Sequence, residues 1–394
     1  MNAQNNNASR KASVFDIATV LIFCVLILAG SIFTFILPDK DFSENENTSL
    51  TTLSDVFAGD VLKNLFSGEL FDRAADYFRH QFPLRDKMLE LKAFSDMALV
   101  RYETNGVVYG ADGYLIPRED NASTAFASGN AAAINALLTA LEAEGTNAVF
   151  ALVPRPADVL QKYYPSAYSD EPLEKVREMI LAEVDALDLK PVLKRAADKG
   201  EYVYYKTDHH WTSYGAYLAY CEVMRGFGVS PLPIDSFERE VVSTEFYGTS
   251  QSSVMSPAAE PDTVEFFVQK DGKALVTEIV YENRTLDGVY DRSALEAKDK
   301  YLAFMGGNYG LAKVTADGED REKLLIVKDS YANCAVQFFA AHYDLVIVDP
   351  RYYKNSVYEL AKEEGVDRVL VLCGVDGMTD ANTYLVLNFG LPKE

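Results

Sequence analysis

The pattern of hydrophobic and polar positions separates an apolar N-terminal run from a polar stretch and a long patterned region. Residues 17–37 read IATVLIFCVLILAGSIFTFIL and carry no charge. As a helix they would span about 30 Å, the thickness of bilayer hydrocarbon. Residues 38–56 are polar and lack helical periodicity, which is typical of a linker. We therefore expect a tail at 1–16, a membrane-spanning anchor at 17–37, a linker at 38–56 and a folded domain over 57–394.

The charges around the apolar run predict its orientation. Arg10 and Lys11 precede the run, whereas the residues after it are mostly acidic: Asp39, Asp41, Glu44 and Glu46 against Lys40. The positive-inside bias then places the N-terminus in the cytoplasm and the domain outside it. A cleaved signal peptide is the alternative, but its apolar core would be about 7 to 15 residues long and would end at a small-x-small site. The small residues at 29–31 lie in mid-run, which favours an uncleaved, single-pass anchor.

Alternating helix and strand patterns predict the core of the domain. The second half contains three continuous apolar runs separated by amphipathic stretches, which predicts strands at 323–328, 344–349 and 367–374 and helices at 331–341 and 355–364. The first half predicts strands at 148–153 and 202–206 and a helix over 170–199. Apolar strands alternating with helices are typical of a parallel sheet covered on both faces. The expected fold class is therefore α/β, with an open three-layer α/β/α domain.

The segments outside this core have other patterns of hydrophobic and polar residues. Helical periodicity predicts helices at 62–79, 85–100 and 123–144, and the glycines at 110–113 indicate a hairpin. Residues 235–300 contain several strand candidates and the tight turn KDGK, which predicts a β-rich insertion. Such an insertion either shapes a substrate groove or is a purely structural hairpin.

The net charge argues against one class of partner, and the cysteines argue against a disulfide framework. The chain of 394 residues has a formal net charge of −22, so a nucleic-acid backbone would be repelled. The four cysteines match neither a CxxC nor a zinc pattern, and one lies in the apolar run. We expect buried thiols and no disulfide framework.

The segment TDHHWTSYGAY places titratable side chains at the turn between a predicted strand and a helix. It contains Asp208, His209, His210 and Trp211, and the protein has only four histidines. Thr212 or Ser213 can cap the following helix, which aims the cluster toward the carboxyl edge of the sheet, where α/β folds bind ligands. A zinc site is one alternative, although no further His or paired Cys completes a ligand set. A plain structural turn is another.

The segment LLIVKDSYAN places Ser330 between a buried strand and the first turn of a helix. Free N–H groups at a helix start can stabilise an oxyanion there. Taken alone, Ser330 or Asp329 is more simply a helix N-cap. A serine becomes a nucleophile only when a base accepts its proton and a carboxylate orients that base. Asp208 and His210 would supply both on a neighbouring strand end, so the two segments together predict a Ser330–His210–Asp208 triad.

The motifs DHHW, GGNYG and KDSYAN resemble those of the bacterial DHHW family, which is related to the AlgX and AlgJ type of SGNH-like polysaccharide O-acetyltransferases. The resemblance runs from about residue 60 to the end. In those acetyltransferases an Asp-x-His-Trp motif pairs with a later serine, which carries over to Asp208, His210 and Ser330. Ordinary SGNH hydrolases have the serine first, so the resemblance implies a circularly permuted SGNH-like fold.

The resemblance also implies residues for the oxyanion and substrate. SGNH enzymes add a glycine N–H and an asparagine side chain to the N–H of the serine. Gly307 and Asn308 are one candidate pair, and the segment with Gly374 and Asp376 is the other. Arg351 either positions substrate or pairs with surface acid, and Trp211 is a further candidate contact for substrate.

The implied function is an extracytoplasmic O-acetyltransferase or esterase acting on secreted polysaccharide or cell-wall glycan, without a metal or other cofactor. Such families often work beside a multipass membrane O-acyltransferase that delivers acetyl groups. The alternative is a non-catalytic carbohydrate-binding or assembly factor of a polysaccharide acetylation or export system.

Overall fold

The computed structural model describes residues 13–43, 45–46, 48–99, 101–118, 123–165, 171–318 and 321–392. The chain forms two compact units, Met1–Ser95 and Asp96–Glu394, which are described separately below. The basic residues Arg10 and Lys11, on which the predicted orientation of the anchor depends, lie outside the described residues.

In the first unit, the predicted anchor is a 23-residue helix, α1 (Val14–Ile36). Ser13 caps its first turn together with Asp16, and its apolar side chains are mostly exposed. Two described helices are long and apolar enough to cross a membrane, and the other, α6 (Thr124–Ala143), has 44% of its apolar window buried against 6% for α1. Helix α6 is therefore a core helix, and α1 is consistent with a membrane anchor.

The rest of the first unit is a short hairpin and short helices. They are β1 (Phe42–Ser43), β2 (Thr48–Ser49), α2 (Leu53–Val56), α3 (Val61–Ser67), α4 (Glu69–Gln81) and the start of α5 (Arg85–Ala98). The single helix predicted at 62–79 is wrong, because Gly68 adopts a left-handed conformation (φ 87°) and divides it into α3 and α4.

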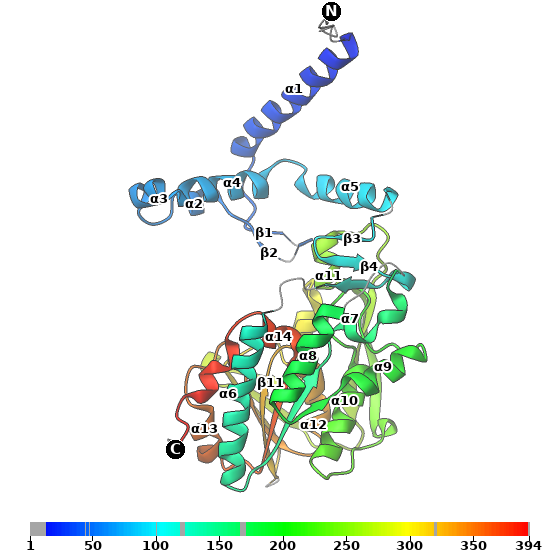
Figure 1. Ribbon diagram of the computed structural model, residues 1–394, viewed down its shortest axis with the longest axis vertical. Helices are drawn as coiled ribbons and strands as arrows, with labels where there is room; N and C mark the ends of the chain where they lie inside the picture. Colours follow the sequence, from blue (N-terminus) through cyan, green and yellow to red (C-terminus); the bar gives the residue numbers. More distant parts are fainter. Residues whose placement is uncertain are drawn as a thin grey trace, which may run out of the picture. The chain divides into compact units, whose positions relative to one another are not determined.

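The second unit has a mixed α/β fold around an eight-stranded sheet (Figure 1). The strand order is β11-β10-β12-β14-β13-β15-β6-β7. Strands β14, β13, β15, β6 and β7 are parallel, and β12, β10 and β11 extend one edge in antiparallel fashion. The bounds are β6 (Asn147–Val153), β7 (Ala186–Asp188), β10 (Leu275–Ile279), β11 (Arg284–Asp287), β12 (Leu311–Ala316), β13 (Lys323–Lys328), β14 (Asp344–Val348) and β15 (Arg368–Gly374).

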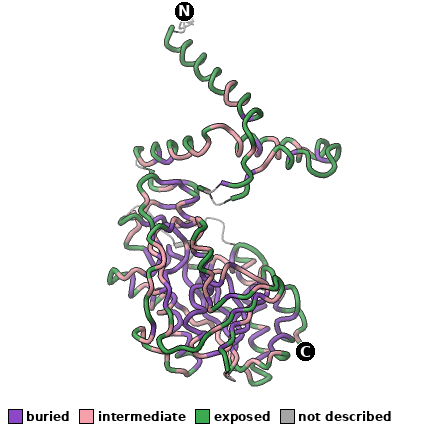
Figure 2. The backbone as a smooth tube through the Cα atoms, turned by 180° about the vertical axis from the view of Figure 1, so that it is seen from behind, coloured by how far each residue is buried: buried purple, intermediate pink, exposed green. Residues whose placement is uncertain are grey.

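Helices cover both faces of this sheet, and buried residues concentrate around it (Figures 1 and 2). Because side chains alternate along a strand, Leu324 and Ile326 of β13 face one hydrophobic cluster and Leu325 and Val327 face the other. The first cluster includes α9 (Lys190–Asp198), α10 (Ser213–Gly226) and α12 (Tyr331–Phe339). The second includes α6, α8 (Glu171–Glu183), α13 (Val357–Glu364) and α14 (Val375–Thr379). The predicted α/β class is thus confirmed.

Two elements of the first half differ from expectation. The helix predicted over 170–199 is interrupted by β7, which pairs with the open edge of β6, and Pro191 then opens α9. The strand predicted at 202–206 is absent among these described residues. Its backbone bonds locally instead, with the Tyr205 N–H donating to the His210 carbonyl and Thr212 to that of Val203. This local pairing folds the chain back on itself just before α10.

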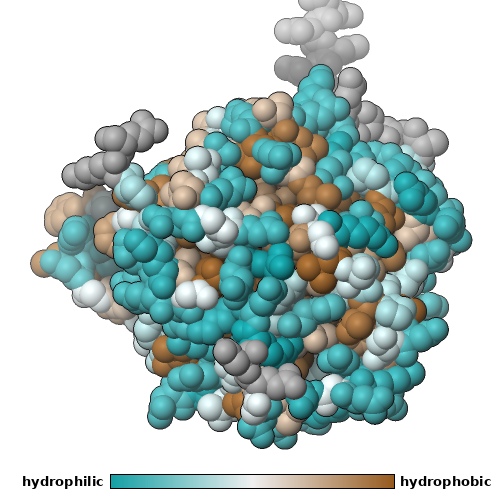
Figure 3. All heavy atoms as spheres, turned by 90° about the horizontal axis from the view of Figure 1, so that it is seen from below, coloured by the Kyte–Doolittle hydropathy of each residue, from teal (hydrophilic) through white to brown (hydrophobic). Residues whose placement is uncertain are grey.

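The remaining segments lie around the sheet. The predicted hairpin is present as β4 (Val107–Tyr109) and β5 (Leu115–Pro117), extended by β3 (Glu103–Thr104). Residues 235–300 contain a separate pair, β8 (Phe237–Phe246) and β9 (Asp262–Gln269), followed by β10 and β11. Between β8 and β9 lies the short helix α11 (Thr249–Val254). Figure 3 shows a mainly hydrophilic face with scattered apolar patches, as on most protein surfaces.

Candidate functional site

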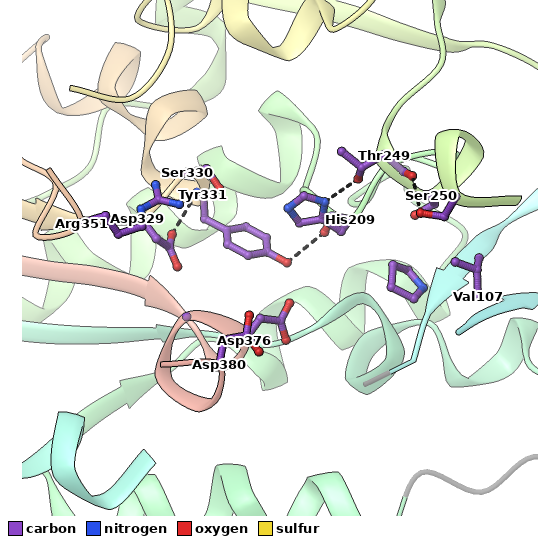
Figure 4. Close-up of a pocket in the computed structure, with 13 residues that line it drawn as sticks. Val107, His209, Thr249, Ser250, Asp329, Ser330, Tyr331, Arg351, Asp376 and Asp380 are labelled. Carbon is purple, nitrogen blue, oxygen red and sulfur yellow. Dashed lines mark hydrogen bonds between the residues drawn. The ribbon is translucent and has the colours of Figure 1, made fainter. Parts of the chain in front are cut away.

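A cavity of about 300 Å³ opens at the carboxyl edge of the parallel strands. Register pairs Val327 of β13 with Val348 of β14 and Val371 of β15, so the loops after these strands meet at one edge. Ser330, Asp329, His209, Thr249 and Arg351 line the cavity and converge on it in Figure 4. The remaining lining residues are Val107, Pro117, Ser250, Ser253, Tyr331, Asp376, Gly377 and Asp380.

Ser330 stands at the start of α12, but its hydroxyl does not cap that helix. The carboxylate of Asp329 accepts the backbone hydrogen bonds at this position instead. Its Oδ1 accepts from the Tyr331 N–H at 3.0 Å, and its Oδ2 accepts from the Gly374 N–H at 2.6 Å. The Ser330 hydroxyl lies 2.8 Å from Nε2 of His210. Ser330 therefore occupies the N-cap position without capping the helix through its side chain, Asp329 accepts the N–H of Tyr331 instead, and the serine hydroxyl lies against the imidazole of His210.

His210 connects the serine to a carboxylate. Its Nδ1 lies 2.6 Å from Oδ1 of Asp208, and its backbone N–H donates to the same oxygen at 2.9 Å. Because an ionised carboxylate only accepts, the proton of the ring belongs on Nδ1, which leaves the lone pair of Nε2 toward Ser330. The ring stacks on Tyr301 with centroids 3.8 Å apart, and the Tyr301 hydroxyl donates to the Ser330 carbonyl at 3.0 Å.

Asp208 is buried, and both of its oxygens are occupied. Oδ2 accepts from the N–H of Thr249 at 2.8 Å and from its hydroxyl at 3.0 Å. Burial alone would raise the pKa of Asp208, but His209, His210 and these hydrogen bonds hold it well below its ordinary value. The approach of the Thr249 segment needs Gly248, because a Cβ there would lie 2.2 Å from the Cβ of Asp208.

His209 lies on the other side of the motif and lines the cavity, with 31% of its side chain exposed. Its Nδ1 is 2.7 Å from the Thr249 hydroxyl, and its ring lies 3.8 Å from that of His210. Burial and the neighbouring His210 lower the pKa of His209 to about 4. His209 is therefore neutral near pH 7.

The DHHW segment also groups ligand atoms of Asp208, His209 and His210 within 4.8 Å of one another, as a metal site would require. Nδ1 of His210 is already bonded to Asp208, and Nδ1 of His209 to Thr249. Each carboxylate oxygen of Asp208 accepts two hydrogen bonds. A metal would have to displace this network, so the donor set fits the zinc alternative poorly.

The other predicted site residues divide into two groups. Arg351 lines the cavity, and its Nε and Nη2 donate to the buried carboxylate of Asp349 at 2.9 and 2.6 Å. Trp211 is fully buried and donates through Nε1 to the Tyr331 carbonyl at 2.9 Å, so it joins the two motifs and does not face the cavity. Gly307 and Asn308 do not line the cavity either: Asn308 Oδ1 accepts from the buried Lys328 at 2.6 Å.

In the other candidate oxyanion segment, which contains Gly374 and Asp376, one of the two groups is already hydrogen-bonded. The Gly374 N–H donates to Asp329, whereas Asp376 lines the cavity. The N–H of Ser330 has no acceptor among the described residues. It is therefore available as a donor at the nucleophile.

Sequence reasoning missed two supports of the site. Thr249 reaches Asp208 from α11, and Tyr301 stacks on His210 from a 3₁₀ turn (Lys300–Ala303). Both lie in or beside the segment predicted as a β-rich insertion, which marked a region near the site but not these residues. The segment thus contributes Thr249, Ser250 and Ser253 to the lining of the cavity.

Residues 191–349 match the sequence model of the DHHW protein family. A curated relative from Pseudomonas putida, named probable alginate O-acetylase AlgJ, is 30% identical over 164 residues, covering 39% of this chain and 42% of the relative. The protein of the same name from Azotobacter vinelandii is 28% identical over 161 residues, covering 39% and 41%. The chain thus matches about two fifths of the length of these relatives.

Two solved structures share the fold. A DHHW family protein from Eubacterium siraeum has a TM-score of 0.60 at 21% identity, covering 74% of this chain and 98% of that one. Bacillus cereus PatB1 has a TM-score of 0.59 at 20% identity, covering 70% and 98%. The resemblance expected from the DHHW and KDSYAN motifs is confirmed: residues 191–349 match the DHHW family model, and about two fifths of the chain is similar to proteins named probable alginate O-acetylase AlgJ.

Proposed function

We propose that the chain is an extracytoplasmic serine O-acyltransferase that moves acetyl or similar acyl groups onto polysaccharide. The observation that carries the proposal is the continuous relay from Asp208 through His210 to Ser330, with contacts of 2.6 and 2.8 Å, ending at a cavity. A buried carboxylate that fixes the tautomer of an imidazole, itself bonded to a serine, is the arrangement that activates serine in acyl transfer.

The chemistry follows from these positions. Ser330 Oγ attacks the acyl carbon of a donor ester, and its proton passes to His210 Nε2. The bond to the leaving alcohol then breaks, and that alcohol takes the proton from His210. In the second half, an acceptor hydroxyl gives its proton to His210 and attacks the acyl carbon. The bond to Oγ breaks, and the proton returns to Ser330.

The negative charge on the carbonyl oxygen needs donors in both halves of the reaction. The N–H of Ser330 supplies one. Arg351 supplies another, because Asp349 holds its Nε and Nη2 and leaves Nη1 for the cavity that it lines. In this proposal Arg351 replaces Gly307 and Asn308 as the second donor, since those residues lie against Lys328 and Asn333.

The substrate class and location extend the proposal. The relatives are named alginate O-acetylases, which supports a secreted polysaccharide or cell-wall glycan as acceptor. Helix α1 would anchor the chain with its N-terminus in the cytoplasm, beside a multipass acyltransferase that supplies acetyl groups. We also propose the circularly permuted SGNH-like topology and the organisation into a tail (1–16), anchor (17–37), linker (38–56) and domain (57–394).

Release of p-nitrophenol from p-nitrophenyl acetate by the full chain in detergent tests the proposal. We expect release by the wild type and loss of at least about 1,000-fold in Ser330→Ala and His210→Ala. Ser128→Ala in α6 is the matched serine control and should keep the wild-type rate, because Ser128 is half-buried, donates to Glu183 and does not line the cavity. Glycan binding without ester cleavage, or cleavage unaffected by Ser330→Ala, would instead support the binding or assembly alternative.

A further inference from the structure

The triad uses one histidine of the DHHW motif, and the other histidine occupies a position with a chemistry of its own. His209 lines the cavity together with Ser330 (Figure 4). The centroid of its ring lies 3.8 Å from that of His210. The mechanism above assigns no step to it. What it can offer a ligand depends on which of its ring nitrogens carries the proton.

The hydrogen bonds around Thr249 settle that question. The Thr249 hydroxyl lies 3.0 Å from Oδ2 of Asp208 and 2.7 Å from Nδ1 of His209. Asp208 is ionised and can only accept, so the single hydroxyl proton of Thr249 goes to Asp208. The Thr249 oxygen must then accept from His209, which places the ring proton on Nδ1.

Nε2 of His209 is consequently an unprotonated acceptor with no partner among the described residues. The ring stays neutral near pH 7, because burial and the neighbouring His210 disfavour a second positive charge. His209 therefore presents a second nitrogen acceptor at the cavity, in a ring whose centroid lies 3.8 Å from that of His210 with 37° between the two planes. The acceptor on His210 is 2.8 Å from Ser330 Oγ and serves the reacting hydroxyl.

We infer that His209 Nε2 binds a second hydroxyl of the acyl acceptor, adjacent to the hydroxyl that attacks, so that the site selects vicinal diols of a sugar ring. The inference rests on the proposed acyl transfer. The attacking hydroxyl must give its proton to His210 and cannot donate to His209 at the same time. A neighbouring hydroxyl on the same ring can, because the centroids of the two imidazoles lie only 3.8 Å apart.

The Asp329, Asp376 and Asp380 carboxylates on the cavity wall agree with such a ligand. Carboxylates and an unprotonated imidazole nitrogen all accept hydrogen bonds, and sugar hydroxyls donate them. Water has no second hydroxyl at the required position. Binding through His209 therefore favours transfer to a glycan over hydrolysis of the acyl-enzyme.

Small alcohols test the inference with the full chain. p-Nitrophenyl acetate supplies the acyl group, 1,2-propanediol and 1-propanol compete as acceptors, and the acetylated products are measured by chromatography. We expect the wild type to prefer the diol. His209→Asn keeps a donor near the Nδ1 position for Thr249 but loses the Nε2 acceptor, and should lower the diol preference about threefold to tenfold, the range for one hydrogen bond.

His209→Gln is the matched variant, because its side-chain oxygen can reach the Nε2 position, and it should restore part of the preference. If His209→Asn lowers both products and hydrolysis by one common factor, His209 only supports Asp208, and the inference is overturned. An unchanged preference in His209→Asn overturns it as well. Failure of the wild type to form a Ser330-dependent acyl-enzyme would instead refute the proposed function, on which this inference depends.

Discussion

Nδ1 of His210 lies 2.6 Å from Oδ1 of Asp208, and this contact fixes the proton of the imidazole on the side away from Ser330. The contact is local in sequence, because the two residues are two positions apart, and the Thr249 hydroxyl and N–H hold the carboxylate in place. The orientation of the base thus depends on one buried aspartate.

Asp208→Asn should therefore reverse the hydrogen bond with little change of shape. The amide would donate to Nδ1, which moves the ring proton to Nε2 and removes the acceptor for the Ser330 proton. We expect the rate of p-nitrophenyl acetate cleavage to fall about 10³- to 10⁴-fold. Circular dichroism should show that the variant is folded. A variant that keeps more than about a tenth of the rate would show that Asp208 does not orient His210.

The close approach of α11 to Asp208 predicts a packing defect. In Gly248→Ala the new Cβ would meet the Cβ of Asp208 at 2.2 Å, so the loop must move. We expect the free energy of unfolding to fall by about 1–3 kcal/mol and ester cleavage to fall with it. Gly226→Ala in α10 is the control, because its nearest neighbour would be Val149 at 3.6 Å, an ordinary contact. Equal stability of the two variants would contradict the packing described.

His209 predicts how stability depends on pH. Its pKa is about 4 in the folded chain, below the ordinary value of 6.5. Between these values the unfolded chain binds a proton that the folded chain does not, so the free energy of unfolding falls as the pH falls through this window. Urea unfolding at several pH values should show a shallower fall in His209→Gln. An identical slope in the variant would contradict the lowered pKa.

The charges of the cavity predict a preference among glycans. Asp329, Asp376 and Asp380 line it, and Arg351, the only cation among the described lining residues, is paired with Asp349. Acidic acceptors should therefore be disfavoured. At low salt we expect transfer to a neutral cello-oligosaccharide to exceed transfer to an oligomannuronate of equal length by about tenfold, and Asp380→Asn to narrow the gap. Faster transfer to the uronate would refute this reading of the cavity.

Local patterns predicted the parallel core well. The apolar runs of β13, β14 and β15 are buried on both faces, and such strands are recognisable without knowledge of their partners. The residues 202–206 also look like a strand, but the chain returns within a few residues, and Tyr205 bonds to His210 instead of to the sheet. Pairing of this kind depends on the turn that follows and not on the run itself.

The candidate site divides in the same way. The sequence placed Asp208 and His210 on a strand end of the same sheet as Ser330, but residues 202–206 form no strand of that sheet, and the pair meets Ser330 from the local turn before α10. Asn308 was placed at the oxyanion by resemblance, but it accepts from Lys328, a buried lysine whose charge needs partners. Thr249 and Tyr301 come from short helical turns whose position depends on long-range packing, so no sequence spacing identified them.

Direct detection of an acyl-enzyme tests the central claim most sharply. The full chain is mixed with p-nitrophenyl acetate, quenched in acid within one turnover, digested and analysed by mass spectrometry. The account predicts an acetyl group on Ser330, at high occupancy in the wild type and absent in His210→Ala. Ester cleavage at the wild-type rate with no acetyl on Ser330, or with the acetyl group on another residue, would contradict it.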